Sequence, residues 1–306
     1  MTGSPCDPPS ILHPTFTGER RLGSRGEPIL VAMISIGMST SAVYPLSTEE
    51  AFRLAGLSGF DGVEVMVTQD PVTQDPAALT ALARAFSLPV LSVHAPVLPL
   101  TQLVWGGDPA RKLERSAELA VAVGAGTVVV HPPYRWQPGY ARRFAAHVRE
   151  VSRRYGVTVA VENMFPIAVG PVTVRAFSPG HDPVAAGSDA ITLDFSHAAL
   201  AGRDSLELAM AAGDRLRHVH LCDGTGTMAE GHLDEHLVPG RGTQPVAEVL
   251  QYLGGRRWSG SLIAEVATRG ARSDHERLDL LSETVRFARK HIGIGLARRQ
   301  RRASAG

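Results

Sequence analysis

The chain has 306 residues, of which 44% are hydrophobic and 20% are charged, and its formal net charge is +1. This size and composition are ordinary for a globular protein with one large α/β domain or two smaller ones. A net charge so close to zero gives no general electrostatic reason to expect nucleic acid or a membrane surface as a partner.

The two ends of the chain lack the periodicity of the middle. Residues 1–28 are rich in Gly, Pro, Ser and Arg, which predicts a flexible leader. Residues 293–306 are predicted to form a basic, disordered tail, and without its four arginines the net charge of +1 becomes −3. We find no signal-peptide pattern, no membrane-spanning apolar run and no disulfide framework for Cys6 and Cys222. These features lead us to expect a cytoplasmic protein.

Between these ends, residues 29–292 repeat a strand followed by a helix. Strands are predicted at 29–36 (ended by Gly37), 62–67, 89–94, 126–131, 157–162, 190–194, 216–221 and 261–266. Helices are predicted at 46–57, 75–86, 108–123, 139–155, 183–187, 205–212, 244–253 and 274–291. Eight such units predict an α/β fold, a (β/α)8 TIM barrel. A doubly wound open sheet is the alternative, but it usually has fewer strands and a Gly-rich first turn.

Six of the predicted strands have a histidine or an acidic residue as their last or second-last residue. These residues are His94, His131, Glu162, Asp194, His220 and Glu265. In a TIM barrel the carboxyl ends of the strands meet at one mouth, so these side chains would converge there. Converging imidazoles and carboxylates without lysine or arginine are costly to bury unless a cation neutralises them. A divalent metal with mixed N and O ligands, such as Zn, Mn or Co, is the prediction, against the alternative of satisfied core residues.

Further polar residues lie near the same mouth. His197 follows Asp194 by three residues, and Asp234 and His236 lie two apart on the loop after the seventh strand. Together they could form a second ligand group, or Asp234 and His236 could be ordinary solvated loop residues. The Pro239-Gly240-Arg241-Gly242 turn is able to hold an anion or a hydroxyl-rich ligand, which makes Arg241 a candidate substrate contact.

Four other residues near the mouth are of interest. Glu64 ends the second strand and either faces the pocket as a substrate contact or pairs with a helix. Asn163 is expected to orient Glu162 or its loop, next to the substrate. His218 is expected in a core layer of the barrel, and Asp223 either supports His220 or caps a loop.

Residues 30–290 resemble the xylose isomerase-like TIM barrel superfamily, which includes sugar-phosphate isomerases and epimerases and endonuclease IV-type AP endonucleases. The resemblance rests on Phe60-Asp61-Gly62-Val63-Glu64-Val65, Glu162-Asn163, Leu193-Asp194 with His197, His218-Val219-His220-Leu221, Val238-Pro239-Gly240-Arg241-Gly242 and Ala264-Glu265.

The isomerase branch of this superfamily implies one divalent metal held by Glu162, Asp194, His220 and Glu265. The two glutamates would also shuttle a proton at the carbon next to a carbonyl, through an enediolate, while His197 contacts a substrate oxygen. The resulting prediction is a metal-dependent isomerase or epimerase acting on a small carbohydrate. Barrels of this kind often pair, so a homodimer is possible.

The nuclease branch implies three zinc ions and nine ligands, with Glu162 bridging two of the metals. Residues of the required types stand at all nine positions: His94, His131, Glu162, Asp194, His197, His220, Asp234, His236 and Glu265. An endonuclease IV-like phosphodiester hydrolase is therefore the alternative. The number of metal ions is one in the isomerase prediction and three in the nuclease prediction, so one to three ions are expected. Against it, no aromatic follows His94, Asp194 is followed by Phe195 rather than Thr or Ser, and the body is slightly acidic. A barrel that binds a sugar or a metal without catalysis is the third possibility.

Overall fold

The computed structural model describes residues 34–96, 101, 103–169, 172–174, 176–228 and 234–304. The chain divides into two units, Met1–Ala32 and Met33–Gly306, and only the second is considered below. The predicted leader, residues 1–28, lies outside the described residues.

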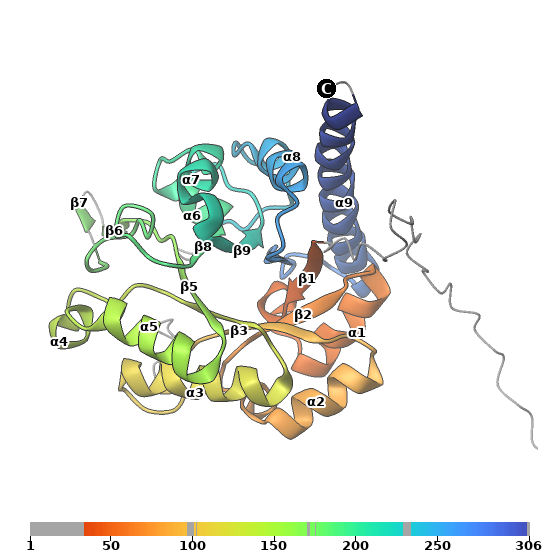
Figure 1. Cartoon of the computed structure of the whole chain (residues 1–306). Coiled ribbons are helices and arrows are strands. Elements are labelled where there is room, and N and C mark those ends of the chain that lie inside the picture. The colour runs from red at the N-terminus through yellow and green to blue at the C-terminus, as the bar shows by residue number, and fades with distance from the viewer. Residues whose placement is uncertain are drawn as a thin grey trace, which may run out of the picture. The chain divides into compact units, whose positions relative to one another are not determined.

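Eight parallel strands close into a barrel in the order β1-β10-β9-β8-β5-β4-β3-β2 (Figure 1). The strands are β1 (Ser35–Ser39), β2 (Gly62–Met66), β3 (Val90–His94), β4 (Thr127–Val130), β5 (Thr158–Glu162), β8 (Ile191–Asp194), β9 (Leu216–Leu221) and β10 (Ser261–Ala264). The predicted TIM barrel is confirmed. Gly37 does not end the first strand but lies inside β1, paired with Gly62 and Ile263. A β-carbon there would crowd the side chains of Ile263 and Leu91, so glycine allows the close approach.

Helices follow most of the barrel strands. They are α1 (Thr48–Ser58), α2 (Pro76–Ala85), α3 (Pro109–Val123), α4 (Pro138–Ala141), α5 (Phe144–Tyr155), α6 (Phe195–Leu200), α7 (Ser205–Ala212), α8 (Val246–Arg256) and α9 (Asp274–Ser304). Short 3-10 turns lie at η1 (Thr40–Val43), η2 (Pro71–Gln74) and η4 (Gly213–Arg215). Asp75, Asp108 and Asp204 begin α2, α3 and α7 by accepting a backbone N–H with their side chains.

Three local predictions are corrected. The single helix predicted at 139–155 is divided into α4 and α5, with Arg142 and Arg143 between them. The helix predicted at 183–187 is a set of turns, because Gly187 adopts a positive φ of 73° and ends it. An antiparallel pair, β6 (Ile167–Val169) and β7 (Val172–Val174), lies between β5 and β8 and was not predicted.

Helix α9, dark blue in Figure 1, continues to Ser304, so the prediction of a disordered tail is wrong for residues 293–304. The cause is packing on α8. A β-carbon on Gly295 would overlap the backbone of Gln251, so the two helices meet backbone to backbone. Arg299 of the same segment donates to the carbonyl of Gly255 at 3.2 Å. Among the described helices, none combines the length and apolarity needed to cross a membrane.

The helix contact makes a direct prediction. Gly295→Ala is expected to lower the free energy of unfolding by about 1–3 kcal/mol, because α8 and α9 must separate to admit the methyl group. Gly293→Ala is the matched control on the same helix, since its β-carbon would meet nothing within 4 Å. That variant should be neutral or stabilising by roughly 0.5–1 kcal/mol. Urea unfolding of both variants measures the difference, and equal midpoints would contradict the packing described.

The barrel interior contains polar layers because side chains alternate along each strand. His218 and His220 lie two apart on β9, and Ser92 and His94 lie two apart on β3, so each pair points to the same side. The strand register places Glu64 beside Ser92 in the lower layer. The residues between them, such as Val93 and Val219, are fully buried in the hydrophobic core.

Candidate active site

Four predicted ligands come together at the carboxyl end of the barrel. Glu162 ends β5, Asp194 ends β8, His220 lies near the end of β9, and Glu265 directly follows β10. One potential ligand atom from each of the four lies within 4.8 Å of those of the others. All four side chains are buried, Glu265 being the most exposed at 6%.

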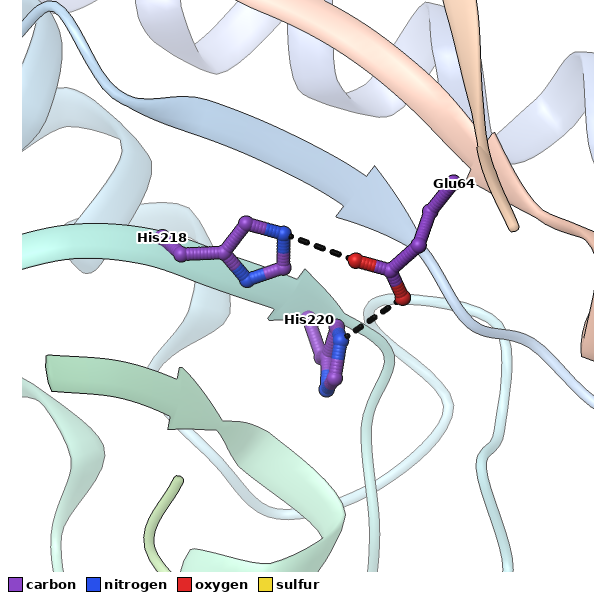
Figure 2. Close-up of side chains that lie close together, drawn as sticks. All are labelled: Glu64, His218 and His220. Atoms are coloured by element: carbon purple, nitrogen blue, oxygen red, sulfur yellow. Dashed lines mark hydrogen bonds and ion pairs between the residues drawn. The ribbon is translucent and has the colours of Figure 1, made fainter. Parts of the chain in front are cut away.

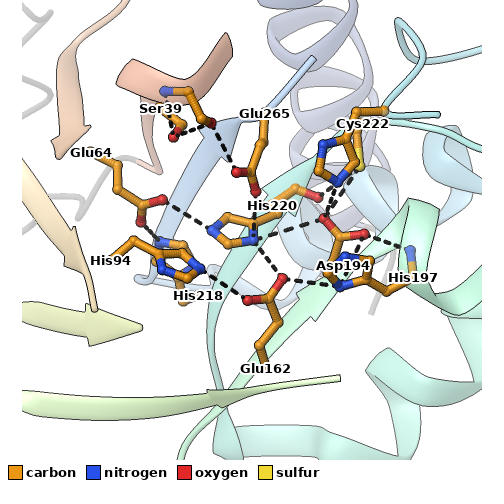
Figure 3. A network of polar contacts seen from close by, with 12 residues as sticks. Ser39, Glu64, His94, Glu162, Asp194, His197, His218, His220, Cys222 and Glu265 are labelled. Atoms are coloured by element: carbon orange, nitrogen blue, oxygen red, sulfur yellow. Dashed lines mark hydrogen bonds and ion pairs between the residues drawn. The ribbon is translucent and has the colours of Figure 1, made fainter. Parts of the chain in front are cut away.

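The ring of His220 lies at the centre of this group (Figure 3). Its Nδ1 atom is 2.9 Å from Glu162 Oε1, 3.0 Å from Glu265 Oε2 and 3.8 Å from Asp194 Oδ2. Glu162 and Glu265 approach the ring from opposite sides, because their strands β5 and β10 are separated in the barrel by β8 and β9. The two carboxylates therefore face each other across a common point.

Glu162 also contacts a second pair of histidines. Its Oε2 atom lies 3.2 Å from His94 Nε2 and 3.1 Å from His131 Nε2. His131 Nδ1 is buried and has no hydrogen-bond partner among the described residues. Glu162 thus lies between two groups of imidazoles, as a bridging carboxylate would.

The Asp194–His197 spacing follows from a helix start. Asp194 is the N-cap of α6 and accepts the backbone N–H of His197 at 2.7 Å. Asn163 fixes the same point, because its amide donates to the Asp194 carbonyl at 3.0 Å and accepts the Asp194 N–H at 2.7 Å. The predicted orienting role of Asn163 is therefore directed at the backbone of Asp194.

Asp234 and His236 lie close to His197. Asp234 Oδ2 is 2.8 Å from His197 Nε2 and 3.2 Å from His236 Nε2, which in turn is 3.6 Å from Asp194 Oδ2. His236 adopts a positive φ of 41°, an uncommon conformation outside glycine. The loop turns at this residue instead of remaining extended.

Histidines supply the positive charge of the cluster. Within the described part of the chain, every ion pair of Glu162, Asp194 and Glu265 is with an imidazole. Burial alone would raise the pKa of Glu162, but His220, His131 and His197 outweigh burial and hold it well below its usual range. Burial lowers the pKa of His220, whereas Glu265, Glu162 and Glu64 together raise it well above its usual range. Burial also lowers the pKa of His236, but the carboxylates of Asp234 and Asp194 outweigh burial and raise this pKa to about 9.

These observations test whether the residues suit a divalent metal. Glu162 and Glu265 meet at Nδ1 of His220 and need positive charge there. Among the described residues, protonated imidazoles provide this charge. The buried Nδ1 of His131 has no hydrogen-bond partner among the described residues. A set of nitrogen and oxygen donors that includes an unused imidazole nitrogen is a set that Zn, Mn or Co accepts. The residues fit a metal.

Glu64 and Arg241 differ from expectation, and Asp223 takes one of its two predicted roles. Glu64 is fully buried beneath His220 and does not face the mouth as a substrate contact. Arg241 points to the exterior, where it pairs with Glu283 of α9 at 2.6 Å and its side chain is 50% exposed. Asp223 caps its loop by accepting the N–H groups of Gly240 and Gln244, so it does not support His220.

Contacts from the first βα loop were missed by the sequence reasoning. Ser41 donates to Glu265 Oε1 at 2.9 Å, and its hydroxyl is 2.7 Å from that of Ser39. The first strand was predicted to end before Gly37, so Ser39 and Ser41 were not recognised as residues at its carboxyl end. A polar Ser-Thr-Ser run at a strand end was the available signal.

A hollow opens beside His131. Its lining includes Pro96, Lys112, Tyr134 and Gln137, and the Lys112 ammonium donates to the carbonyls of Pro96 and Thr101 at 3.1 Å each. Tyr134 stacks on the exposed ring of Trp136 with centroids 4.3 Å apart. The cluster of candidate ligands therefore adjoins a small space with aromatic and polar walls, the kind of space that takes a small molecule.

The chain is a TIM barrel protein with a closed parallel barrel and with histidines and carboxylates gathered at the carboxyl ends of the strands. The model of the xylose isomerase-like TIM barrel family matches residues 52–291, and the chain belongs to this family.

Known proteins resemble this chain to different degrees. An uncharacterized protein of Mycobacterium tuberculosis is 47% identical over 279 residues, covering 85% of this chain and 98% of its own. Fructoselysine 3-epimerase of Escherichia coli O157:H7 is 22% identical over 253 residues, covering 76% and 90%. The structure of 3-keto-D-glucoside 4-epimerase from E. coli aligns with a TM-score of 0.60 at 20% identity, covering 83% and 100%. At this identity the structural likeness concerns the fold.

Proposed function

We propose that the protein is a metal-dependent isomerase or epimerase that acts on a small polyhydroxylated carbonyl compound. The observation that carries this proposal is the meeting of Glu162, Asp194, His220 and Glu265 at one point, with the two glutamates on opposite sides. The activities named for fructoselysine 3-epimerase and 3-keto-D-glucoside 4-epimerase support a carbohydrate substrate.

In this proposal the two glutamates transfer the proton. One carboxylate removes a proton from the carbon next to the substrate carbonyl, which gives an enediolate, and the other returns a proton. Because they stand on opposite sides of the shared point, return from the second side inverts the carbon and gives an epimer. His197 is the proposed contact for a substrate oxygen. Its Nδ1 lies 3.0 Å from the Asn163 carbonyl, so the substrate oxygen would take the place of Asp234 at Nε2.

Glu162, Asp194, His220 and Glu265 are the proposed metal ligands. The metal, Zn, Mn or Co, supplies positive charge that neutralises the negative charge developing on the substrate oxygens. Ser41, which donates to Glu265 at 2.9 Å, and Asn163, which fixes the backbone of Asp194, keep these ligands in place.

Phosphodiester hydrolysis is the second candidate, and a specific observation favours it. The two outer groups are His94 with His131, and His197 with Asp234 and His236. His94, His131 and His197 contact Glu162, and His236 lies 3.6 Å from Asp194. The nine positions that the nuclease branch implies are therefore together in space. Against this candidate, the net charge of the chain is only +1, whereas duplex binding calls for a basic surface.

Metal content separates the two candidates. We expect about one tightly bound metal ion per chain in the purified protein, measured by elemental analysis, with Asp234→Asn leaving the ratio unchanged because Asp234 is not a ligand in the one-metal arrangement. About three ions per chain, reduced by Asp234→Asn, together with nicking of abasic DNA, would contradict the isomerase proposal. Wild-type protein without any metal would contradict both candidates.

A further inference from the structure

A buried polar unit lies directly beneath the candidate metal ligands. It consists of Glu64 on β2, Ser92 on β3 and His218 on β9. Figure 2 shows one carboxylate oxygen of Glu64 facing His218 and the other facing His220. All four side chains are fully buried, with 0% exposure. Neither the metal ligands nor the proton transfer proposed above uses Glu64, although burying a carboxylate is costly unless it has a role or partners.

Both oxygens of Glu64 are engaged. Oε1 lies 3.1 Å from His220 Nε2, while Oε2 lies 3.0 Å from His218 Nε2 and accepts the Ser92 hydroxyl at 2.7 Å. His218 and Ser92 hold one oxygen, so the other has a fixed position under His220. The carboxylate is therefore oriented by the layer in which it lies.

This contact determines which nitrogen of His220 carries a proton. Carboxylates only accept hydrogen bonds, and they lie at both nitrogens of His220, so each nitrogen can carry a proton there. When a divalent cation takes the place of the proton on Nδ1, Glu64 holds the remaining proton on Nε2. The lone pair is then on Nδ1, the atom that lies 2.9 Å from Glu162 and 3.0 Å from Glu265. A metal ligand needs that lone pair.

We propose that Glu64 is a positioning residue that fixes the ring and the tautomer of His220, so that Nδ1 is presented to a divalent metal. The inference rests on the proposed function, in which His220 is a ligand. The substrate-contact role predicted for Glu64 is replaced by this one. His218 and Ser92 act through Glu64, because they hold its second oxygen.

The test is metal affinity of the full chain, measured by zinc titration of metal-free protein against a chromophoric chelator. Glu64→Gln keeps the shape but has one acceptor oxygen and an NH2 group that opposes an imidazole N–H. We expect zinc to bind about 10–100-fold more weakly. Ser92→Ala is the control, since it removes one bond to Glu64 but retains its charge and its contacts with both histidines; its zinc affinity should change by less than that of Glu64→Gln.

Unchanged zinc affinity in folded Glu64→Gln would overturn the inference. Glu64, His218 and His220 form a group that could itself hold an ion. If Glu64→Gln bound one zinc ion fewer per chain and held the remaining zinc with unchanged affinity, Glu64 would be a ligand itself, and the inference would be overturned. Failure of the wild-type protein to bind zinc would instead contradict the proposed function.

A second measurement does not depend on the folding of Glu64→Gln. Long-range 1H–15N NMR of zinc-loaded, 15N-histidine-labelled wild-type protein should show His220 with its proton on Nε2, assigned by the signal missing in His220→Gln. A merely structural role for Glu64 does not require this tautomer in the loaded protein. A proton on Nδ1 with a bare Nε2 would overturn the inference.

Discussion

Glutamine in place of Glu162 or Glu265 is expected to reduce turnover roughly a hundredfold to ten-thousandfold, the usual contribution of a general acid or base. The amide has nearly the shape of the carboxylate but cannot take up a proton at neutral pH. Each glutamate is buried and within 3.0 Å of His220 Nδ1, so no water or neighbouring surface group takes its place. Steady-state kinetics of both variants measure the effect.

Glu283→Gln is the matched control for these substitutions. This substitution makes the same chemical change, but at an exposed residue that forms an ion pair with Arg241 on the outside of the barrel. Its turnover should equal that of the wild type, because this ion pair lies outside the candidate active site. Near-normal turnover in either Glu162→Gln or Glu265→Gln would refute the acid–base assignment.

Removal of the metal is expected to abolish activity and to destabilise the fold. Binding to the folded state alone contributes about 4 kcal/mol when the free metal is a thousandfold above its Kd. For a domain of this size, losing that stabilisation corresponds to a fall in Tm of roughly 10 °C. The physical reason is that Glu162, Asp194 and Glu265 are then left close together with only imidazoles to neutralise them. Thermal unfolding before and after chelation measures the shift.

Restoring the metal should restore both Tm and turnover. His275→Ala is a suitable control, because the His275 side chain is 89% exposed and its loss should leave the response to chelation unchanged. An unchanged Tm after elemental analysis has shown the metal to be gone would contradict the metal-site assignment.

The barrel and most of its mouth could be predicted because each rests on a local pattern. Strand β9 coincides with its predicted range, 216–221, since an apolar run bounded by polar residues specifies a buried strand. The convergence of Glu162, Asp194, His220 and Glu265 then follows from parallel strands in a closed barrel. The Asp194–His197 pair was visible as a spacing, and the N-cap of α6 explains it.

Other features depend on contacts between distant segments and left no local pattern. The register of β2 against β3 places Glu64 next to Ser92 in the lower layer, so a residue predicted at the mouth lies beneath it. The arginine-rich segment after residue 292 is helical because Gly295 permits contact with α8, which its charge does not indicate. Arg241 is turned outwards by Glu283, a partner 42 positions away in the chain.

Transfer of a proton to carbon is the central claim, and its most direct test is deuterium incorporation. The metal-loaded protein is incubated in D2O with a panel of ketoses, including D-fructose, D-tagatose and D-allulose, and the products are followed by 1H NMR. We predict a product that has gained solvent deuterium at the carbon next to the carbonyl, with no incorporation by Glu162→Gln or Glu265→Gln. An isomer or epimer formed without solvent deuterium, or no reaction with any sugar alongside cleavage of abasic DNA, would contradict it.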